Sequence, residues 1–234
     1  MSRILVIPDV HLKPEIYRKA AVVMYYEKCD ATVMLGDLAD DWNQDRNIEL
    51  YDETFDAALE YIRHHQDTFL CLGNHDVSYR WGFMQSGYSY YARDSVLKGL
   101  DKLEKALPPE NVGYVFRFGK VLFSHAGLTE SFVHRNFGQK NIDYVIAMIN
   151  GKMEPEQLWE DDSPLWARPQ LQYTRLYPED MYQVVGHTPQ RAPMAVGKLI
   201  STDTFSTYRN GMPYGNKTFI IIDTADAAIE YVKG

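Results

Sequence analysis

Aspartate, histidine and asparagine side chains follow short apolar segments at five places along the chain. These places read Asp9-Val10-His11, Gly36-Asp37, Gly73-Asn74-His75-Asp76, Ser124-His125 and Gly186-His187. Carboxylate, amide and imidazole groups are suitable ligands for Mn, Fe, Zn, Co or Ni ions. One such residue after a strand is more often a turn former, but five successive cases indicate a metal centre.

The apolar segments before the first three groups are expected to be strands, at residues 3–7, 31–35 and 68–72. Between them, apolar residues recur at helical spacing within 16–24 and 51–62. This βαβαβ order predicts a parallel sheet, whose strand carboxyl ends form a crevice for ligands. We expect the adjacent glycines to allow the backbone turns that direct the next side chain into this crevice.

The rest of the chain has a more varied pattern. Residues 77–95 contain many aromatic residues among Gly and Ser, and we expect an aromatic-rich insertion outside the core. A helix is expected over 96–107 and a largely helical stretch over 130–159. Further strands are expected at 114–118, 121–124, 182–185, 198–202, 218–222 and 228–232. These elements predict a single α/β domain, residues 1–234, in which two packed mixed β-sheets are flanked by helices.

The composition limits the possible functions. The 234 residues include 24 Lys and Arg against 32 Asp and Glu, a formal net charge of −8, so extended nucleic-acid binding is not expected. The apolar runs are far shorter than the ~20 residues that cross a bilayer, and the first residues predict a strand instead of a signal peptide. Cys29 and Cys71 are too few for a disulfide framework. We therefore expect a cytoplasmic protein with no membrane partner.

The spacing of the candidate ligands resembles that of the calcineurin-like metallophosphoesterase superfamily. The shared pattern is Asp-x-His, Gly-Asp-x-x-Asp, Gly-Asn-His-Asp, His and Gly-His-Thr, from Asp9 to His187. Pro189 stands where many members have a second histidine, which favours the phosphoprotein phosphatase branch. The segment 163–169, with its Leu-Trp-x-Arg, is similar to one in small bacterial and bacteriophage protein phosphatases and in symmetrical dinucleoside tetraphosphatases. The resemblance implies a four-layer αββα sandwich.

The resemblance also implies two divalent metal ions, with manganese expected first and Fe, Zn, Co or Ni as alternatives. Asp9, His11 and Asp37 would hold one ion, and Asp37, Asn74, His125 and His187 the other, so Asp37 is the expected bridge. Two ions, two carboxylates and a bridging hydroxide sum to +1, which attracts a phosphate dianion to an acidic chain. That hydroxide would attack phosphorus directly, without a covalent phosphoenzyme.

The family pattern makes His75 the expected general acid for the leaving group, oriented by Asp40. Asp40 has a simpler alternative role as a loop cap. Relatives of this branch usually follow the second aspartate with Arg-Gly, and that arginine binds the phosphate, but here the residues are Asp41-Trp42. Arg168 is the expected phosphate ligand. Arg80 and Arg93 are candidates for the missing arginine, although most arginines are solvated surface residues.

These residues favour hydrolysis of a phosphomonoester, similar to that by protein serine/threonine phosphatases, with a phosphoprotein or a nucleotide as substrate. The alternative is a dinucleoside tetraphosphate hydrolase, since aromatic residues within 79–91 could stack on a nucleobase. A nuclease or phosphodiesterase is less favoured by the acidic chain and by Pro189. An inactive, metal-containing binding module is the hypothesis of another class, motivated by the missing arginine at position 41.

Overall fold

The structure is a computed structural model that describes residues 2–172 and 174–234. Its first sheet has the strand order β11-β10-β1-β2-β3-β4. The strands are β1 (Arg3–Ile7), β2 (Ala31–Met34), β3 (Thr68–Cys71), β4 (Val112–Gly113), β10 (Thr218–Asp223) and β11 (Ile229–Lys233). β1, β2 and β3 pair in parallel, as the βαβαβ pattern predicts, β4 continues this parallel order beside β3, and β10 joins β1 in the antiparallel direction.

The second sheet has the order β5-β6-β7-β9-β8. Its strands are β5 (Val115–Phe118), β6 (Val121–Ser124), β7 (Tyr182–Val185), β8 (Met194–Val196) and β9 (Leu199–Ser201). β6, β7 and β9 are parallel, whereas β5 and β8 are antiparallel edge strands. The parallel strands bring the ends of β6 and β7 to the same edge of this sheet.

Alternate residues of each strand face the two sides of its sheet. Ile4 and Val6 of β1 belong to the apolar layer between the two sheets, which also contains Phe123 of β6 and Val184 of β7. Leu5 of β1 faces the other way, into the core beneath the helices. The fold is therefore an α/β arrangement of two packed mixed sheets with helices outside, as the sequence predicts.

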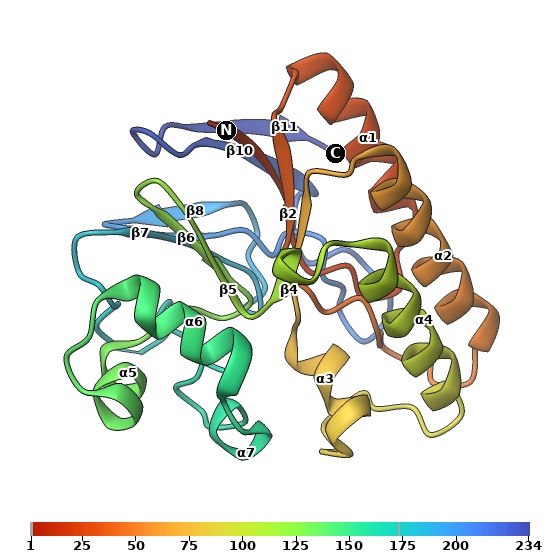
Figure 1. The fold of residues 1–234 in the computed structure, drawn as a ribbon. Helices are drawn as coiled ribbons and strands as arrows, with labels where there is room; N and C mark the ends of the chain where they lie inside the picture. Colours follow the sequence, from red (N-terminus) through yellow and green to blue (C-terminus); the bar gives the residue numbers. More distant parts are fainter. Residues whose placement is uncertain (1, 173) are drawn as a thin grey trace.

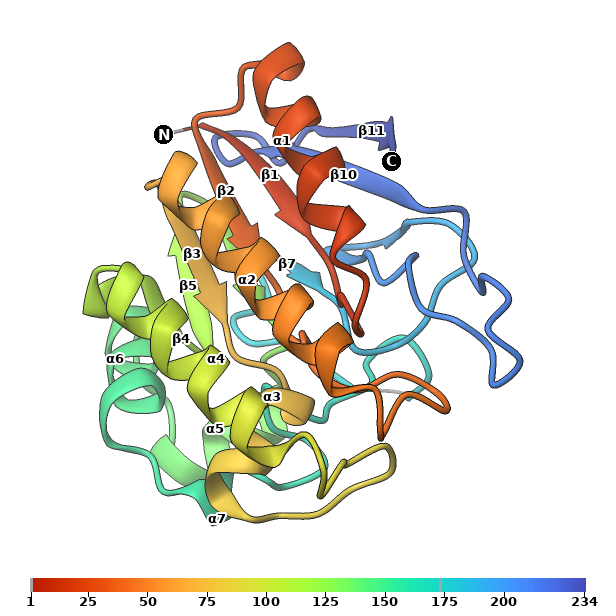
Figure 2. The ribbon, with the colours of Figure 1, turned by 90° about the vertical axis from the view of Figure 1, so that its right-hand side faces the viewer.

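Helices cover the outer faces of both sheets. α1 (Glu15–Glu27), α2 (Ile48–His64) and α4 (Arg93–Ala106) lie side by side over the first sheet, as Figures 1 and 2 show. α5 (Glu130–Phe137), α6 (Ile142–Lys152) and the short α7 (Pro155–Leu158) lie beside the second sheet (Figure 1). Their buried residues, Phe132 of α5 and Ile149 of α6 among them, share a core with Leu122 of β6. None of the helices described is long and apolar enough to span a bilayer.

The segment 77–95 differs from its expectation. Its first residues complete α3 (Asn74–Trp81), and Val77 and Tyr79 are fully buried in the core. The expectation that this segment lies outside the core is therefore wrong for its first part. Tyr90 and Tyr91 do lie on the surface. The aromatic residues resembled a surface insertion because a helix of eight residues shows little periodicity.

Candidate active site

The loops that follow β1, β2, β3, β6 and β7 meet at one end of the two sheets. The backbone N–H groups of Val10 and His11 both donate to the Asp37 carbonyl, at 3.0 and 2.8 Å. The buried Asp76 carboxylate accepts from the N–H groups of Asp37 and Gly73, at 2.8 and 2.9 Å. The N–H of His187 donates to the Asp9 carboxylate at 2.9 Å. These bonds fix the loops after β1, β2, β3 and β7 to one another.

Four site residues have left-handed backbone conformations. They are His11 (φ 45°), Asp37 (φ 49°), Asp40 (φ 64°) and His187 (φ 61°). Such conformations cost about 1–3 kcal/mol each for residues with a side chain and persist only where surrounding contacts impose them. The loop hydrogen bonds supply those contacts. The strain is therefore concentrated where the side chains must be directed toward a common point.

The glycines of the site have a different role from the expected one. Of the three glycines that stand beside candidate ligands, Gly36, Gly73 and Gly186, only Gly36 has a positive φ, 92°, and there the expectation of a glycine-dependent turn is right. Gly73 has an ordinary extended conformation with φ −95°. A Cβ at Gly73 would overlap Asp37 Oδ1, and a Cβ at Gly186 would overlap Asp9 Oδ1. At these two positions glycine provides space for a carboxylate.

Gly186→Ala is expected to displace the Asp9 carboxylate and to lower metal affinity about 10-fold or more, because displaced ligands lose coordination geometry. Metal titration of the purified variant measures this loss. Gly151→Ala in α6 is the matched control, since a Cβ there meets nothing within 4 Å. A Gly186→Ala protein with unchanged metal affinity would contradict the packing argument.

Two groups of side chains in the described part of the chain could each hold a metal ion. One consists of Asp9, His11 and Asp37, and the other of Asp37, His125 and His187. The potential ligand atoms of each group lie within 4.8 Å of one another. Asp37 is common to both groups. This geometry is what a carboxylate between two neighbouring ions requires.

Backbone carbonyls orient two of the histidines. Nδ1–H of His11 donates to the Asp40 carbonyl, and Nδ1–H of His125 donates to the Leu35 carbonyl, both at 2.8 Å. Nε2 is then the nitrogen left to face a ligand, and the Nε2 atoms of His11 and His125 lie 3.8 and 3.3 Å from Asp37 Oδ2. Such bonds are the usual way in which a metal-binding histidine is held in one tautomer.

The amide of Asn74 adds an oxygen to the second group. Its Oδ1 lies 2.9 Å from His125 Nε2, while its Nδ2 donates to Gln85 Oε1 at 2.5 Å. The contact with Gln85 fixes which end of the amide faces the histidines. Gln85 was not identified from the sequence, because nothing in the local pattern separates it from a polar surface residue.

The charge distribution fits divalent cations. Burial and the neighbouring Asp203 raise the pKa of Asp9 well above its usual range. Burial also favours protonated Asp37, but His125 and His75 outweigh it and hold the pKa of Asp37 low. Burial keeps the pKa of His187 well below its usual value, so the ring is neutral.

His187 also provides a direct test of the fit. Its Nδ1 atom lies 3.0 Å from His125 Nε2, and that same His125 atom lies 3.3 Å from Asp37 Oδ2. A cation bound among these three atoms would pair with all of them at once. Buried carboxylates together with neutral imidazoles form the donor set that divalent transition metals prefer. The residues present therefore fit two divalent ions.

His75 and Asp40 form a hydrogen-bonded pair at the edge of these groups. Nδ1–H of His75 donates to Asp40 Oδ2 at 2.8 Å. The other oxygen of Asp40 accepts from the hydroxyls of Tyr51 and Tyr79, and the carboxylate is only 1% exposed. Burial lowers the pKa of His75, but Asp37 and Asp40 outweigh it and raise the pKa. Asp40 is thus more than a loop cap.

The two tyrosines on Asp40 could not be identified from the sequence. Tyr51 begins the apolar face of α2 and Tyr79 lies in the short α3, so both resemble ordinary core residues. Burial and the adjacent Asp40 raise the pKa of each phenol, which keeps both neutral and able to donate. Their hydroxyls replace water as the partners of a buried carboxylate.

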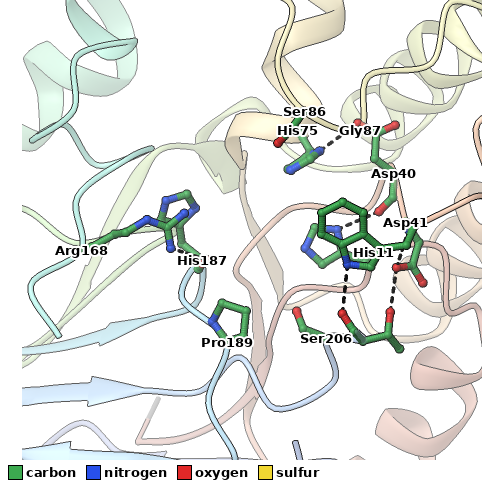
Figure 3. A pocket seen from close by; sticks show the side chains of 12 residues that line it. His11, Asp40, Asp41, His75, Ser86, Gly87, Arg168, His187, Pro189 and Ser206 are labelled. Atoms are coloured by element: carbon green, nitrogen blue, oxygen red, sulfur yellow. Dashed lines mark hydrogen bonds and ion pairs between the residues drawn. The ribbon is translucent and has the colours of Figure 1, made fainter. Parts of the chain in front are cut away.

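A pocket of about 220 Å³ opens over the site. Its lining includes His11, His75 and His187 together with Arg168, Trp42 and Pro189. Figure 3 shows Arg168 and His187 on one side of the pocket and Asp40, Asp41 and His75 on the other. The side chains that could bind a phosphoryl group and the side chain that could protonate its leaving group therefore face a shared space.

The structure separates the three candidate arginines. Arg168 lines the pocket, and its guanidinium donates to the His187 carbonyl and to Thr188 Oγ1, at 3.2 and 3.1 Å. Arg80 forms an ion pair of 2.6 Å with Glu104 of α4. Arg93 pairs with the adjacent Asp94 at 3.3 Å. Neither Arg80 nor Arg93 is among the described residues that line the pocket.

Asp41 and Trp42 occupy the place of the arginine that relatives carry. The Asp41 carboxylate accepts from Lys13 Nζ at 2.9 Å and from Thr207 Oγ1 at 2.8 Å. Because Lys13 neutralises Asp41, the carboxylate adds little repulsion toward an anionic substrate. Asp203 is buried and accepts from Ser206 Oγ at 2.8 Å.

Solved structures share the fold over almost the whole chain. A cold-active protein tyrosine phosphatase is 16% identical, with a TM-score of 0.62 and coverage of 99% of this chain and 78% of the other. A metallophosphoesterase from Sphaerobacter thermophilus is 16% identical, with a TM-score of 0.52 and coverage of 100% and 88%. The protein TT1561 of Thermus thermophilus is 12% identical, with a TM-score of 0.51 and coverage of 99% and 98%.

No curated protein matches the sequence. The sequence model of one family, described as calcineurin-like phosphoesterase, does match it, over residues 2–212. That match includes every candidate ligand from Asp9 to His187. The chain belongs to the calcineurin-like phosphoesterase family and is a metal-dependent phosphoester hydrolase.

Proposed function

We propose that the protein hydrolyses phosphomonoesters at a centre of two divalent metal ions, with His75 as general acid. The observation that carries this proposal is the position of Asp37, which belongs to both potential ligand groups. The His75–Asp40 pair and Arg168 open onto the same pocket. A phosphoryl group bound there would contact ligands, acid and guanidinium together.

Each residue of the site has a defined task in this reaction. Asp9, His11 and Asp37 would hold one ion, and Asp37, Asn74, His125 and His187 the other. When bound, the two ions supply a water of lowered pKa as the nucleophile and neutralise charge on the phosphoryl oxygens. Manganese is the ion we propose first, because the donor set contains oxygen and imidazole nitrogen but no thiolate.

Arg168 would bind phosphoryl oxygens, since its guanidinium is half-buried and faces the pocket. His75 would donate its proton to the departing oxygen, and Asp40 would hold the ring in position and stabilise its charged form. Tyr51 and Tyr79 would hold the Asp40 carboxylate in place by donating to its second oxygen.

The phosphomonoester reading is favoured over dinucleoside tetraphosphate hydrolysis. The alternative relied on aromatic residues within 79–91 as a stacking surface, but the pocket contains only Ser86 and Gly87 from this segment. Tyr79 is buried and stacks on Tyr88, with ring centroids 4.3 Å apart. The inactive binding module is disfavoured because the proposed ligands and the proposed acid lie together. Phosphoserine and phosphothreonine, which the resemblance to protein serine/threonine phosphatases suggests, are among the phosphomonoesters to be compared.

We also propose a cytoplasmic location. Cys29 and Cys71 are free thiols. Burial raises the pKa of Cys29 to about 11, so this thiol is unreactive at neutral pH. Unpaired cysteines of this kind are typical of proteins in reducing compartments. Fractionation of the native host, followed by detection of the protein in each fraction, tests this location.

The proposed reaction is tested with metal-stripped protein to which Mn, Fe, Zn, Co or Ni is restored. Initial rates are measured on p-nitrophenyl phosphate, bis-p-nitrophenyl phosphate and diadenosine tetraphosphate. We expect metal-dependent turnover that is fastest on the monoester. Faster turnover of the dinucleotide would favour the alternative enzyme, and absence of turnover with every metal would favour the binding module.

A further inference from the structure

Trp42 is an unassigned aromatic side chain in the lining of the active-site pocket. It lines the pocket together with His75 and Arg168, and it is 41% exposed. Histidines apart, it is the only aromatic residue among the described ones that line this pocket. Trp42 therefore presents an aromatic surface to whatever occupies the pocket.

The indole ring is held in one position by the loop that follows β9. Its Nε1–H donates to the Thr207 carbonyl at 3.0 Å, and the guanidinium of Arg209 lies 4.8 Å from the ring centroid. The flanking residues are fixed as well, since Thr207 Oγ1 donates to Asp41 and Asn43 Nδ2 donates to the Arg209 carbonyl. A ring fixed in advance loses little conformational freedom when a ligand stacks on it.

Trp42 belongs to the side of the pocket where the leaving group departs. Its Cα lies two residues from that of Asp40, a reach of at most about 7 Å along the chain. Asp40 holds His75, the proposed proton donor to the leaving oxygen. Arg168, the proposed phosphate ligand, lies on the other side of the pocket (Figure 3). A phosphoryl group near Arg168 therefore directs its leaving group toward the Trp42 side.

We propose that Trp42 stacks on an aromatic ring carried by the leaving group and thereby selects phosphomonoesters that contain such a ring. This inference rests on the proposed function and names its substrate class. The ring could belong to the base of a nucleoside monophosphate or to the phenol of phosphotyrosine, which share planar aromatic chemistry. Phosphoserine and phosphothreonine offer no ring, so the inference replaces them as the expected substrates.

The test compares substrate pairs that differ by the ring. Adenosine 5′-monophosphate is paired with ribose 5-phosphate, and phosphotyrosine with phosphoserine. Trp42→Ala is expected to lower kcat/KM roughly 5- to 150-fold for a substrate with the ring, which is the range for one stacked base, mainly through KM. The ringless member of the pair should change less than two-fold. Because each comparison is variant over wild type on one substrate, differences in intrinsic reactivity cancel.

Two further variants control the measurement. Trp42→Phe keeps an aromatic face and is expected to retain most of the preference. Tyr25→Ala removes an aromatic side chain that is 78% exposed on α1, outside the pocket, and is expected to leave all four rates unchanged. A loss confined to the adenosine pair identifies a nucleobase as the stacking partner, and a loss confined to the tyrosine pair identifies a phenol.

Equal losses on both members of each pair would overturn the proposal, because Trp42 would then only support the loop. If no substrate is turned over and the proposed function fails, stacking on Trp42 is still tested by measuring ligand binding with calorimetry. Phenylphosphonate should bind metal-loaded wild-type protein at least about 5-fold more tightly than methylphosphonate, and Trp42→Ala should abolish the difference. Equal binding of the two phosphonates to wild-type protein would overturn the stacking role.

Discussion

His75→Ala is expected to lower kcat for alkyl phosphomonoesters by about 10²- to 10⁴-fold, the usual contribution of a general acid. Both metal ions should remain bound, because His75 belongs to neither potential ligand group. Steady-state kinetics together with metal analysis of the same preparation measures both quantities. Loss of activity in parallel with loss of metal would contradict the role of His75 as an acid.

The leaving group provides a second readout for His75. A p-nitrophenolate needs no proton to depart, so His75→Ala should slow p-nitrophenyl phosphate much less than an alkyl ester. His64→Ala is the matched control, since His64 is exposed on α2, lies outside the pocket and pairs with Glu60 at 2.9 Å. It should leave both rates unchanged.

The pH profile separates the acid from its partner. Asp40 raises the pKa of His75 through the 2.8 Å hydrogen bond and its charge. Asp40→Asn removes that charge, so the pKa of His75 falls and its protonated form is lost at lower pH. The alkaline limb of the pH–rate profile should therefore move to lower pH in Asp40→Asn. A limb that stays in place would assign the titration to another group.

Asp37→Asn is expected to weaken binding of both metal ions, because Asp37 is the residue that the two groups share. The amide has lost the negative charge and one of the two equivalent oxygens. The loss in affinity should exceed the 10- to 100-fold that changes outside the ligand set usually cause. Metal content after dialysis, together with titration calorimetry, measures the number of ions retained.

Two other variants define what the Asp37 result means. His187→Ala removes a member of only one group, so one ion should be lost before the other. Asp52→Asn changes an exposed carboxylate of α2 outside both groups and should retain full metal content. Two tightly bound ions in Asp37→Asn would show that the bridging assignment is wrong.

Much of the fold followed from local patterns. Continuous apolar runs predicted β1 and β10, because a strand that buries side chains on both faces of its sheet has apolar residues at successive positions. The helices α1, α2 and α4 followed from apolar spacing on one face. β4 and β8 were missed, since strands of two and three residues carry no measurable alternation. The stretch 130–159 is helical but is divided into three helices.

The sequence also predicted that the ligands lie close together, because parallel strands bring their carboxyl ends to one edge of the sheet. Asp9, Asp37 and His187 each follow a strand, and their backbone positions are set by that strand. The glycines beside the ligands also indicated the site. At Gly73 and Gly186, however, glycine is required because a Cβ would overlap a carboxylate, and not because the backbone turns there.

The sequence by itself determined the strand ends, the donor types and hence the metal chemistry, because these depend on neighbouring residues along the chain. Only the tertiary structure decided which distant groups meet. In the folded chain Tyr51 and Tyr79 donate to Asp40, and Arg80 forms an ion pair with Glu104. Trp42, which follows β2, donates to a carbonyl of the loop after β9. Such contacts depend on side-chain direction and on separations of many residues, and no local periodicity records either.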